Sequence, residues 1–84
     1  MENKMFCTIA KRNYINNEMY VFGVIQGLQV GICDIDSPTL GYDCDLFPEV
    51  MIFRTSTTEE KYKKFRNIVE KKYPGLCQFS NEES

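Results

Sequence analysis

FGVIQGLQVGI, residues 22–32, is the stretch that decides the predicted fold. Two runs rich in β-branched and aromatic residues flank Gln26-Gly27, and a polar residue followed by glycine between such runs is typical of a two-residue hairpin turn. Pairing across this turn sets Ile25 opposite Leu28 and lays the ring of Phe22 over Gly31. The sequence therefore predicts a β-hairpin with strands at about 19–26 and 28–34.

Two further segments are predicted as strands. Residues 5–10 alternate between two faces, with Met5, Cys7 and Ile9 on one of them. Residues 50–53 form a short apolar run after a proline, which is typical of a buried strand. Both segments therefore add to a sheet that the hairpin begins.

The clearest helix is predicted over residues 58–73. Its apolar residues recur at three- and four-residue steps and so share one face. Two overlapping capping boxes precede it, Ser56 with Glu59 and Thr57 with Glu60. The apolar stripe consists of Tyr62, Phe65, Ile68, Val69 and Tyr73.

These elements predict an α+β fold in the order β-β-β-(short helix or loop)-β-α. Residues 36–47 are the irregular part, with helix-start chemistry at Asp36-Ser37-Pro38. An antiparallel sheet of three to four strands, with the C-terminal amphipathic helix packed on one face, is the simplest way to bury both apolar surfaces. We expect one domain over residues 1–79 and a disordered polar tail over residues 80–84.

Composition favours a small soluble domain. The 84 residues are 43% hydrophobic and 26% charged, with a net charge of −2. No apolar run approaches the roughly 18 residues that a membrane-spanning helix needs, and the start lacks a signal-peptide hydrophobic region. We therefore expect a cytoplasmic protein that makes no membrane contact.

Cysteine and histidine usage argues against catalysis. The four cysteines form no CxxC pair and three of them have apolar neighbours, so they are predicted to be free, mostly buried thiols. The chain has no histidine, which is the usual base for a serine or cysteine nucleophile and a common zinc ligand. The sequence predicts a non-enzymatic protein with no cofactor and no metal site.

One spacing pattern resembles a known family. An aromatic residue, a valine, two glycines and an aliphatic residue follow one another as Phe22, Val24, Gly27, Gly31 and Ile32. This pattern resembles the hybrid-binding domain of eukaryotic ribonuclease H1, which also occurs in caulimovirus viroplasmins. The resemblance spans Phe22 to Glu60 and includes the Phe47-Pro48 step. It implies a similar compact fold and binding of RNA/DNA hybrids.

The leading functional hypothesis is a protein-protein interaction module of the inhibitor, immunity or adaptor type. The irregular segment carries two aromatic residues, Tyr42 and Phe47, beside the acidic Asp43 and Asp45. Aromatic residues are frequent interface anchors. A sheet of this size also has edge strands, through which a homodimer can form.

The alternative hypothesis is nucleic-acid binding through the helix. Its basic residues include Lys61, Lys64, Arg66 and Lys71, which are the side-chain types that hold phosphates. A solvated helix surface has the same composition. The sequence alone leaves both interpretations open.

A second alternative is a divalent-metal-dependent protein. Asp34 and Asp36 share one face of an extended segment, and Asp43 and Asp45 repeat that spacing. Converging carboxylates bind Mg²⁺ or Ca²⁺. An acidic, solvated loop is the simpler interpretation of these four residues.

Overall fold

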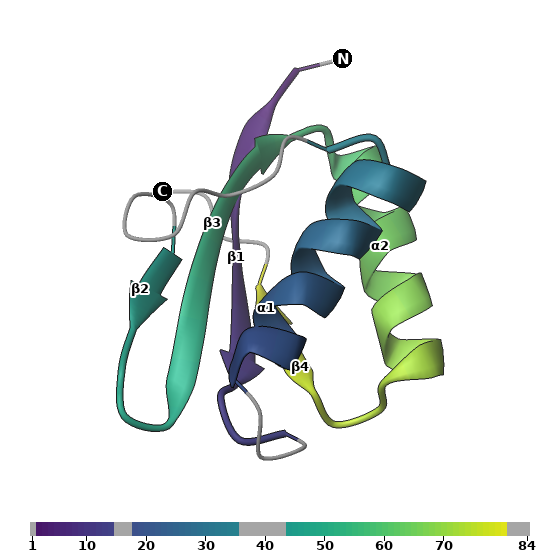
Figure 1. The fold of residues 1–84 in the computed structure, drawn as a ribbon. Helices are drawn as coiled ribbons and strands as arrows, with labels where there is room; N and C mark the ends of the chain where they lie inside the picture. The colour runs from purple at the N-terminus through teal and green to yellow at the C-terminus, as the bar shows by residue number, and fades with distance from the viewer. Residues whose placement is uncertain (1, 15–17, 36–43, 81–84) are drawn as a thin grey trace.

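The computed structural model describes residues 2–14, 18–35 and 44–80 (Figure 1). Four strands form one antiparallel sheet in the order β2-β3-β1-β4, and two helices accompany it. The predicted α+β class, with a small antiparallel sheet and a C-terminal helix packed on it, is confirmed. The elements are β1 (Lys4–Lys11), α1 (Glu18–Gly27), the π-helical turn η1 (Leu28–Ile32), β2 (Cys44–Leu46), β3 (Val50–Thr57), α2 (Glu59–Lys72) and β4 (Cys77–Ser80).

Both helices lie on the same side of the sheet, so the molecule has two layers (Figure 1). The alternation of the central strands decides which side chains meet the helices. In β1 these are Phe6, Thr8 and Ala10, and in β3 they include Met51 and Phe53, all of them buried. The faces predicted for residues 5–10 are therefore confirmed.

Aromatic rings join α2 to the sheet. The ring of Tyr62 on α2 stacks on Phe6 of β1 with centroids 4.2 Å apart. Phe79 of β4 meets Tyr62 and Phe65 edge-on, with both centroid distances at 6.0 Å. Such stacked and edge-to-face pairs add to the stabilisation that burial alone provides.

The predicted hairpin is wrong. Gln26 and Gly27 lie at the end of α1, and Gly27 has the α-helical angles φ −63° and ψ −41°. Val21, Ile25 and Leu28 are buried at steps of four and three residues, the spacing of a helix face. The sequence of this segment thus fits both a strand pattern and a helix pattern. Packing of the apolar helix face on the sheet outweighs the local preference of these residues for strands.

The five residues that resemble the hybrid-binding family consequently lie on α1 and η1 and not on paired strands. The predicted order with three successive strands is wrong for the same reason. In the structure, β1 is followed by α1 and η1 before the next strand begins.

The turn η1 widens the end of α1. The Cys33 amide donates to the Leu28 carbonyl at 3.0 Å, five residues back, and the Ile35 amide donates to the Gln29 carbonyl at 2.7 Å. The wider turn contains the polar side chain of Gln29, which is fully buried. Asp34 then ends the segment with a φ of 58°, a left-handed conformation that is uncommon outside glycine.

The helix predicted over 58–73 is confirmed as α2, with Thr58 and Tyr73 as its caps. The hydroxyl of Thr58 accepts the Lys61 amide at 3.2 Å. The predicted capping boxes are wrong, because Ser56 and Thr57 still belong to β3. Gly75, with a φ of 86°, then turns the chain toward β4.

The remaining strands lie where the sequence suggested irregular structure or the end of the fold. β2 occupies part of the segment 36–47, and β4 reaches Ser80, the first residue of the predicted tail. The helix start predicted at Asp36-Ser37-Pro38 lies outside the described residues, as does 81–84. The strand predicted at 50–53 is confirmed as the first half of β3.

Candidate functional site: the open face of the sheet

The face of the sheet opposite the helices is apolar at its centre. We define the open face as Met5, Cys7 and Ile9 of β1 with Val50 and Ile52 of β3. Ile9 lies directly opposite Ile52 in the register of the two strands. No described helix or strand packs on this face. A two-layer fold normally presents polar side chains here, so a strip of apolar residues is an unusual feature of this face.

A hollow lies at one end of the open face. It measures about 330 Å³ and lies between the central strands and the start of β4. Ile9, Val50 and Lys11 are among the residues that line it. The remaining lining residues are Gly75, Leu76, Cys77 and Gln78.

An ion pair borders the open face on the β2 side. Arg54 Nη1 donates to Asp45 Oδ2 at 2.6 Å, and both side chains are about half exposed. This hydrogen bond, together with the charge of Asp45, raises the pKa of Arg54. The predicted contact residue Asp45 is therefore held in place by Arg54, and exposed pairs of this kind contribute little to stability.

The turn between β2 and β3 presents a second apolar element. Leu46 is 42% exposed and Phe47 is 45% exposed. The Arg12 guanidinium donates to the Phe47 carbonyl at 2.6 Å, and the Phe47 amide donates to Val50 at 2.9 Å. These bonds hold the backbone of Phe47, a predicted anchor, in one position. The other two predicted contact residues, Tyr42 and Asp43, lie outside the described residues.

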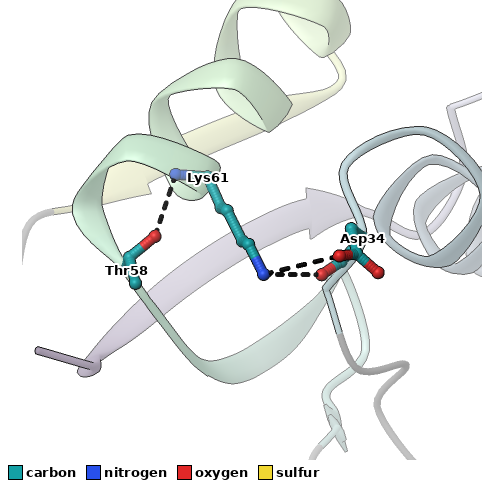
Figure 2. A network of polar contacts seen from close by, with 3 residues as sticks. All are labelled: Asp34, Thr58 and Lys61. Carbon is teal, nitrogen blue, oxygen red and sulfur yellow. Dashed lines mark hydrogen bonds and ion pairs between the residues drawn. The ribbon is translucent and has the colours of Figure 1, made fainter. Parts of the chain in front are cut away.

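A separate depression of about 620 Å³ lies in the helix layer, between the end of η1 and the start of α2. Figure 2 shows its polar contacts, in which Lys61 extends from α2 toward Asp34. The Lys61 ammonium donates to the Asp34 carbonyl at 3.3 Å and lies 3.6 Å from its carboxylate. Lys61 therefore holds Asp34, the left-handed residue that follows the C-cap of η1, which is a structural role.

Cys33 and Lys64 line the same depression. The Cys33 side chain is only 1% exposed. Burial raises the pKa of this thiol more than the positive charge of Lys64 lowers it. The thiol consequently stays protonated at neutral pH, and a protonated thiol is a poor nucleophile.

The basic residues predicted for nucleic-acid binding do not share one face. Each residue turns the helix by about 100°, so Lys64 and Lys71 lie within about 20° of one another and Arg66 lies about 200° from Lys64. Arg66 forms an ion pair with Glu70 at 3.6 Å and lies over the Phe79 ring. Three of these four residues, Lys61, Lys64 and Lys71, lie on one side of α2, and Lys61 is paired with Asp34.

The acidic residues of the metal hypothesis are separated as well. Asp34 lies in the helix layer beside Lys61, whereas Asp45 borders the opposite side of the sheet beside Arg54. Asp36 and Asp43 are outside the described residues. Within residues 2–14, 18–35 and 44–80, no three Cys, Asp or Glu side chains are grouped so that they could hold a metal ion. None of the four cysteines forms a disulfide, as predicted.

Sequence reasoning did not identify the open face, although a signal for it is present. The run Val50–Phe53 is apolar at every position, and residues 5–10 contain only one polar residue. Continuous apolar runs are typical of strands that are covered on both faces. Within the described residues, the helices cover one face of the sheet only.

Comparisons with known proteins give no relative: no family model, no curated protein and no solved structure matches this chain. Across the described part of the chain, no helix is both long and apolar enough to cross a membrane.

Proposed function

We propose that this chain is a non-catalytic protein-binding module that docks on a partner protein through the open face. The observation that carries the proposal is the pair Ile9 and Ile52, which lie side by side at the centre of a sheet face that no described element covers. Removing an apolar strip of this kind from water gains about 25 cal/mol per Å², and the part that exceeds the entropy cost of association stabilises a complex.

The hollow indicates the chemistry of the partner. Its apolar wall of Ile9 and Val50 fits a large aliphatic or aromatic side chain, and Lys11 favours a carboxylate next to it. The exposed Phe47 lies on the turn that leads into β3 and extends the contact surface beyond the sheet. Interface energy concentrates in such buried anchors with a polar rim around them.

Position-specific photo-crosslinking in the native host tests the proposal. A photoreactive amino acid at Ile52 is expected to yield one discrete adduct with a partner protein. The same amino acid at Val30, which is 50% exposed on η1 in the helix layer, serves as the matched control. Equal labelling at both positions would contradict docking through the open face.

The isolated partner then permits a quantitative test. Ile52→Glu is expected to weaken the complex at least tenfold, because it places a charge where apolar contact is made. Val30→Glu should leave the affinity unchanged. Unfolding curves for both variants show whether the loss comes from binding alone.

Nucleic-acid binding is the alternative outcome of a parallel experiment. A labelled RNA/DNA hybrid is titrated at about 50 mM salt, where electrostatic complexes are strong. Binding that is lost in Lys64→Glu and Lys71→Glu, and retained in Ile52→Glu, would favour the basic side of α2 over the open face.

A further inference from the structure

We infer that β4 is a pairing edge through which two copies of this chain join their sheets into one. This inference concerns assembly and does not rest on the proposed function. It begins from the strand order, which places β4 at one edge of the sheet and β2 at the other.

The alternation of hydrogen-bonded pairs between β4 and β1 shows which backbone groups of β4 are available to a further strand. The Lys11 amide donates to the Leu76 carbonyl at 3.0 Å, and the register then pairs Ile9 with Gln78. Hydrogen-bonded pairs alternate along an antiparallel ladder, so the backbone of Gln78 points toward β1. The N–H and C=O groups of Cys77 and Phe79 consequently point away from the sheet.

These two residues are symmetric about Gln78. A second β4 that runs antiparallel to the first can pair Cys77 with Phe79 of the other copy, and Phe79 with its Cys77. The two-fold axis then passes between the two copies of Gln78, which face one another as a pair without backbone hydrogen bonds. Such a contact is self-complementary, as a two-fold interface requires.

The β4 edge also lacks two features that protect sheet edges from pairing, charge and proline. Its four residues include no charged residue and no proline. The β2 edge, by contrast, carries Asp45 and is followed by Pro48. Charge and proline are usual means of blocking an edge, so β4 is the edge that accepts a strand.

Charges on α2 complement one another in this arrangement. Arg66 lies 5.9 Å from the centre of the Phe79 ring, and Glu70, its ion-pair partner, lies one helical turn further along. A two-fold axis at Gln78 places the α2 helices of the two copies antiparallel to one another. Arg66 of each copy therefore faces Glu70 of the other copy. This match of opposite charges favours a second copy as the occupant of the edge.

Charge substitutions at Gln78 test the inference. Gln78 is exposed, so Gln78→Glu and Gln78→Lys leave the fold intact. Light scattering and sedimentation from micromolar to millimolar concentration should show wild-type particles of twice the 9.8 kDa chain mass. Each variant alone should dissociate at least tenfold more readily, because like charges then meet at the axis. An equimolar mixture of the two variants should restore the dimer.

Ser56→Glu and Ser56→Lys, at an exposed position on the same side of the sheet as Gln78 but on β3, serve as matched controls and should not change the association. A wild-type chain that is monomeric at millimolar concentration would overturn the inference. So would a dimer that the Gln78 variants do not weaken, or a mixture that fails to recover.

Amide hydrogen exchange gives a second, independent readout. In dilute monomer the Gln78 amide should already exchange slowly, whereas the Cys77 and Phe79 amides should exchange rapidly. Raising the protein concentration should slow Cys77 and Phe79 selectively. Rates for these two amides that do not depend on concentration would refute pairing at β4.

Discussion

The hydroxyl of Tyr62 on α2 lies 2.8 Å from the hydroxyl of Thr8 on β1, inside the core. Tyr62 also donates to the Cys7 carbonyl at 3.0 Å, so Thr8 donates to Tyr62. Both side chains are nearly inaccessible, with 3% of Tyr62 and none of Thr8 exposed. This pair fixes the position of α2 over the sheet and gives the first two predictions.

Tyr62→Phe is expected to lower the free energy of unfolding by about 1–2 kcal/mol, because the ring still stacks on Phe6 but the Thr8 hydroxyl loses its partner. Replacing both partners, as Tyr62→Phe with Thr8→Val, should recover part of that loss, since no buried hydroxyl is then unpaired. Urea denaturation of the four proteins in this double-mutant cycle measures the coupling. Strictly additive losses would show that the two hydroxyls do not interact.

Alkaline pH should destabilise the fold. Burial raises the pKa of Tyr62 from 10.0 to about 12, and it raises the pKa of Cys77 from 9.0 to about 12. A raised pKa means that the unfolded chain ionises first, so the contribution of Tyr62 is complete below pH 10 and is lost as the pH rises to 12. For Cys77, the loss of stability begins at about pH 9.

The rise in the pKa of Tyr62 contributes about 2–3 kcal/mol to the free energy of unfolding below pH 10. Denaturation curves recorded from pH 8 to 12 should therefore show stability that falls above pH 9. The difference between wild type and Tyr62→Phe should shrink between pH 10 and 12, and Cys77→Ala should reduce the slope between pH 9 and 10. A constant difference across this range would contradict the burial of the Tyr62 phenol.

Glycine substitutions separate the helix from the hairpin that the sequence predicts. An added methyl group at Gly23 or Gly27 would meet no atom within 4 Å. In a helix, Gly→Ala at each position should raise the free energy of unfolding by about 0.5–1 kcal/mol. Gly75→Ala is the matched control and should be destabilising, because that residue has a φ of 86°. Thermal or urea unfolding measures all three; a loss of stability in Gly27→Ala would favour a turn at this position.

The buried amide of Gln29 gives a further prediction. Its Nε2 donates to the Thr55 hydroxyl at 2.9 Å, while its Oε1 is buried without a hydrogen-bond partner in the described structure. Gln29→Met with Thr55→Val removes the unpaired oxygen and both members of the bond. This double variant should be more stable than wild type by about 1 kcal/mol in urea denaturation. The single Thr55→Val variant should be less stable, because it leaves the whole Gln29 amide unpaired.

Local signals in the sequence determined α2, β1 and the first half of β3. The apolar residues of α2 recur at the three- and four-residue steps of a helix, and residues 5–10 alternate between two faces as in a strand. Each pattern therefore indicates one type of secondary structure. The cap shifted by one residue to Thr58 because pairing with β1 extends β3 to Thr57. In these segments local propensity and long-range packing favour the same structure.

The segment 22–32 shows why tertiary structure was needed for the rest. Its glycines and β-branched residues favour strands locally, yet the same residues place Val21, Ile25 and Leu28 on one helical face. Only packing on the sheet decides between strand and helix. In that packing the ring centroids of Phe22 and Phe53 are 5.7 Å apart. The short strands β2 and β4 are likewise stable only by pairing with β3 and β1.

The candidate site divides in the same way. The sequence alone determined that residues 5–10 and 50–53 are apolar on both faces of their strands and that basic residues gather on α2. Tertiary structure decided that both helices cover one face of the sheet, which leaves Ile9 and Ile52 together on the other. The separation of Arg66 from Lys64 follows from the helical period of α2 itself, because positions two residues apart in a helix point to nearly opposite sides. Composition fixes how much apolar surface a chain must bury, whereas only the packing of its elements determines which part of that surface stays uncovered.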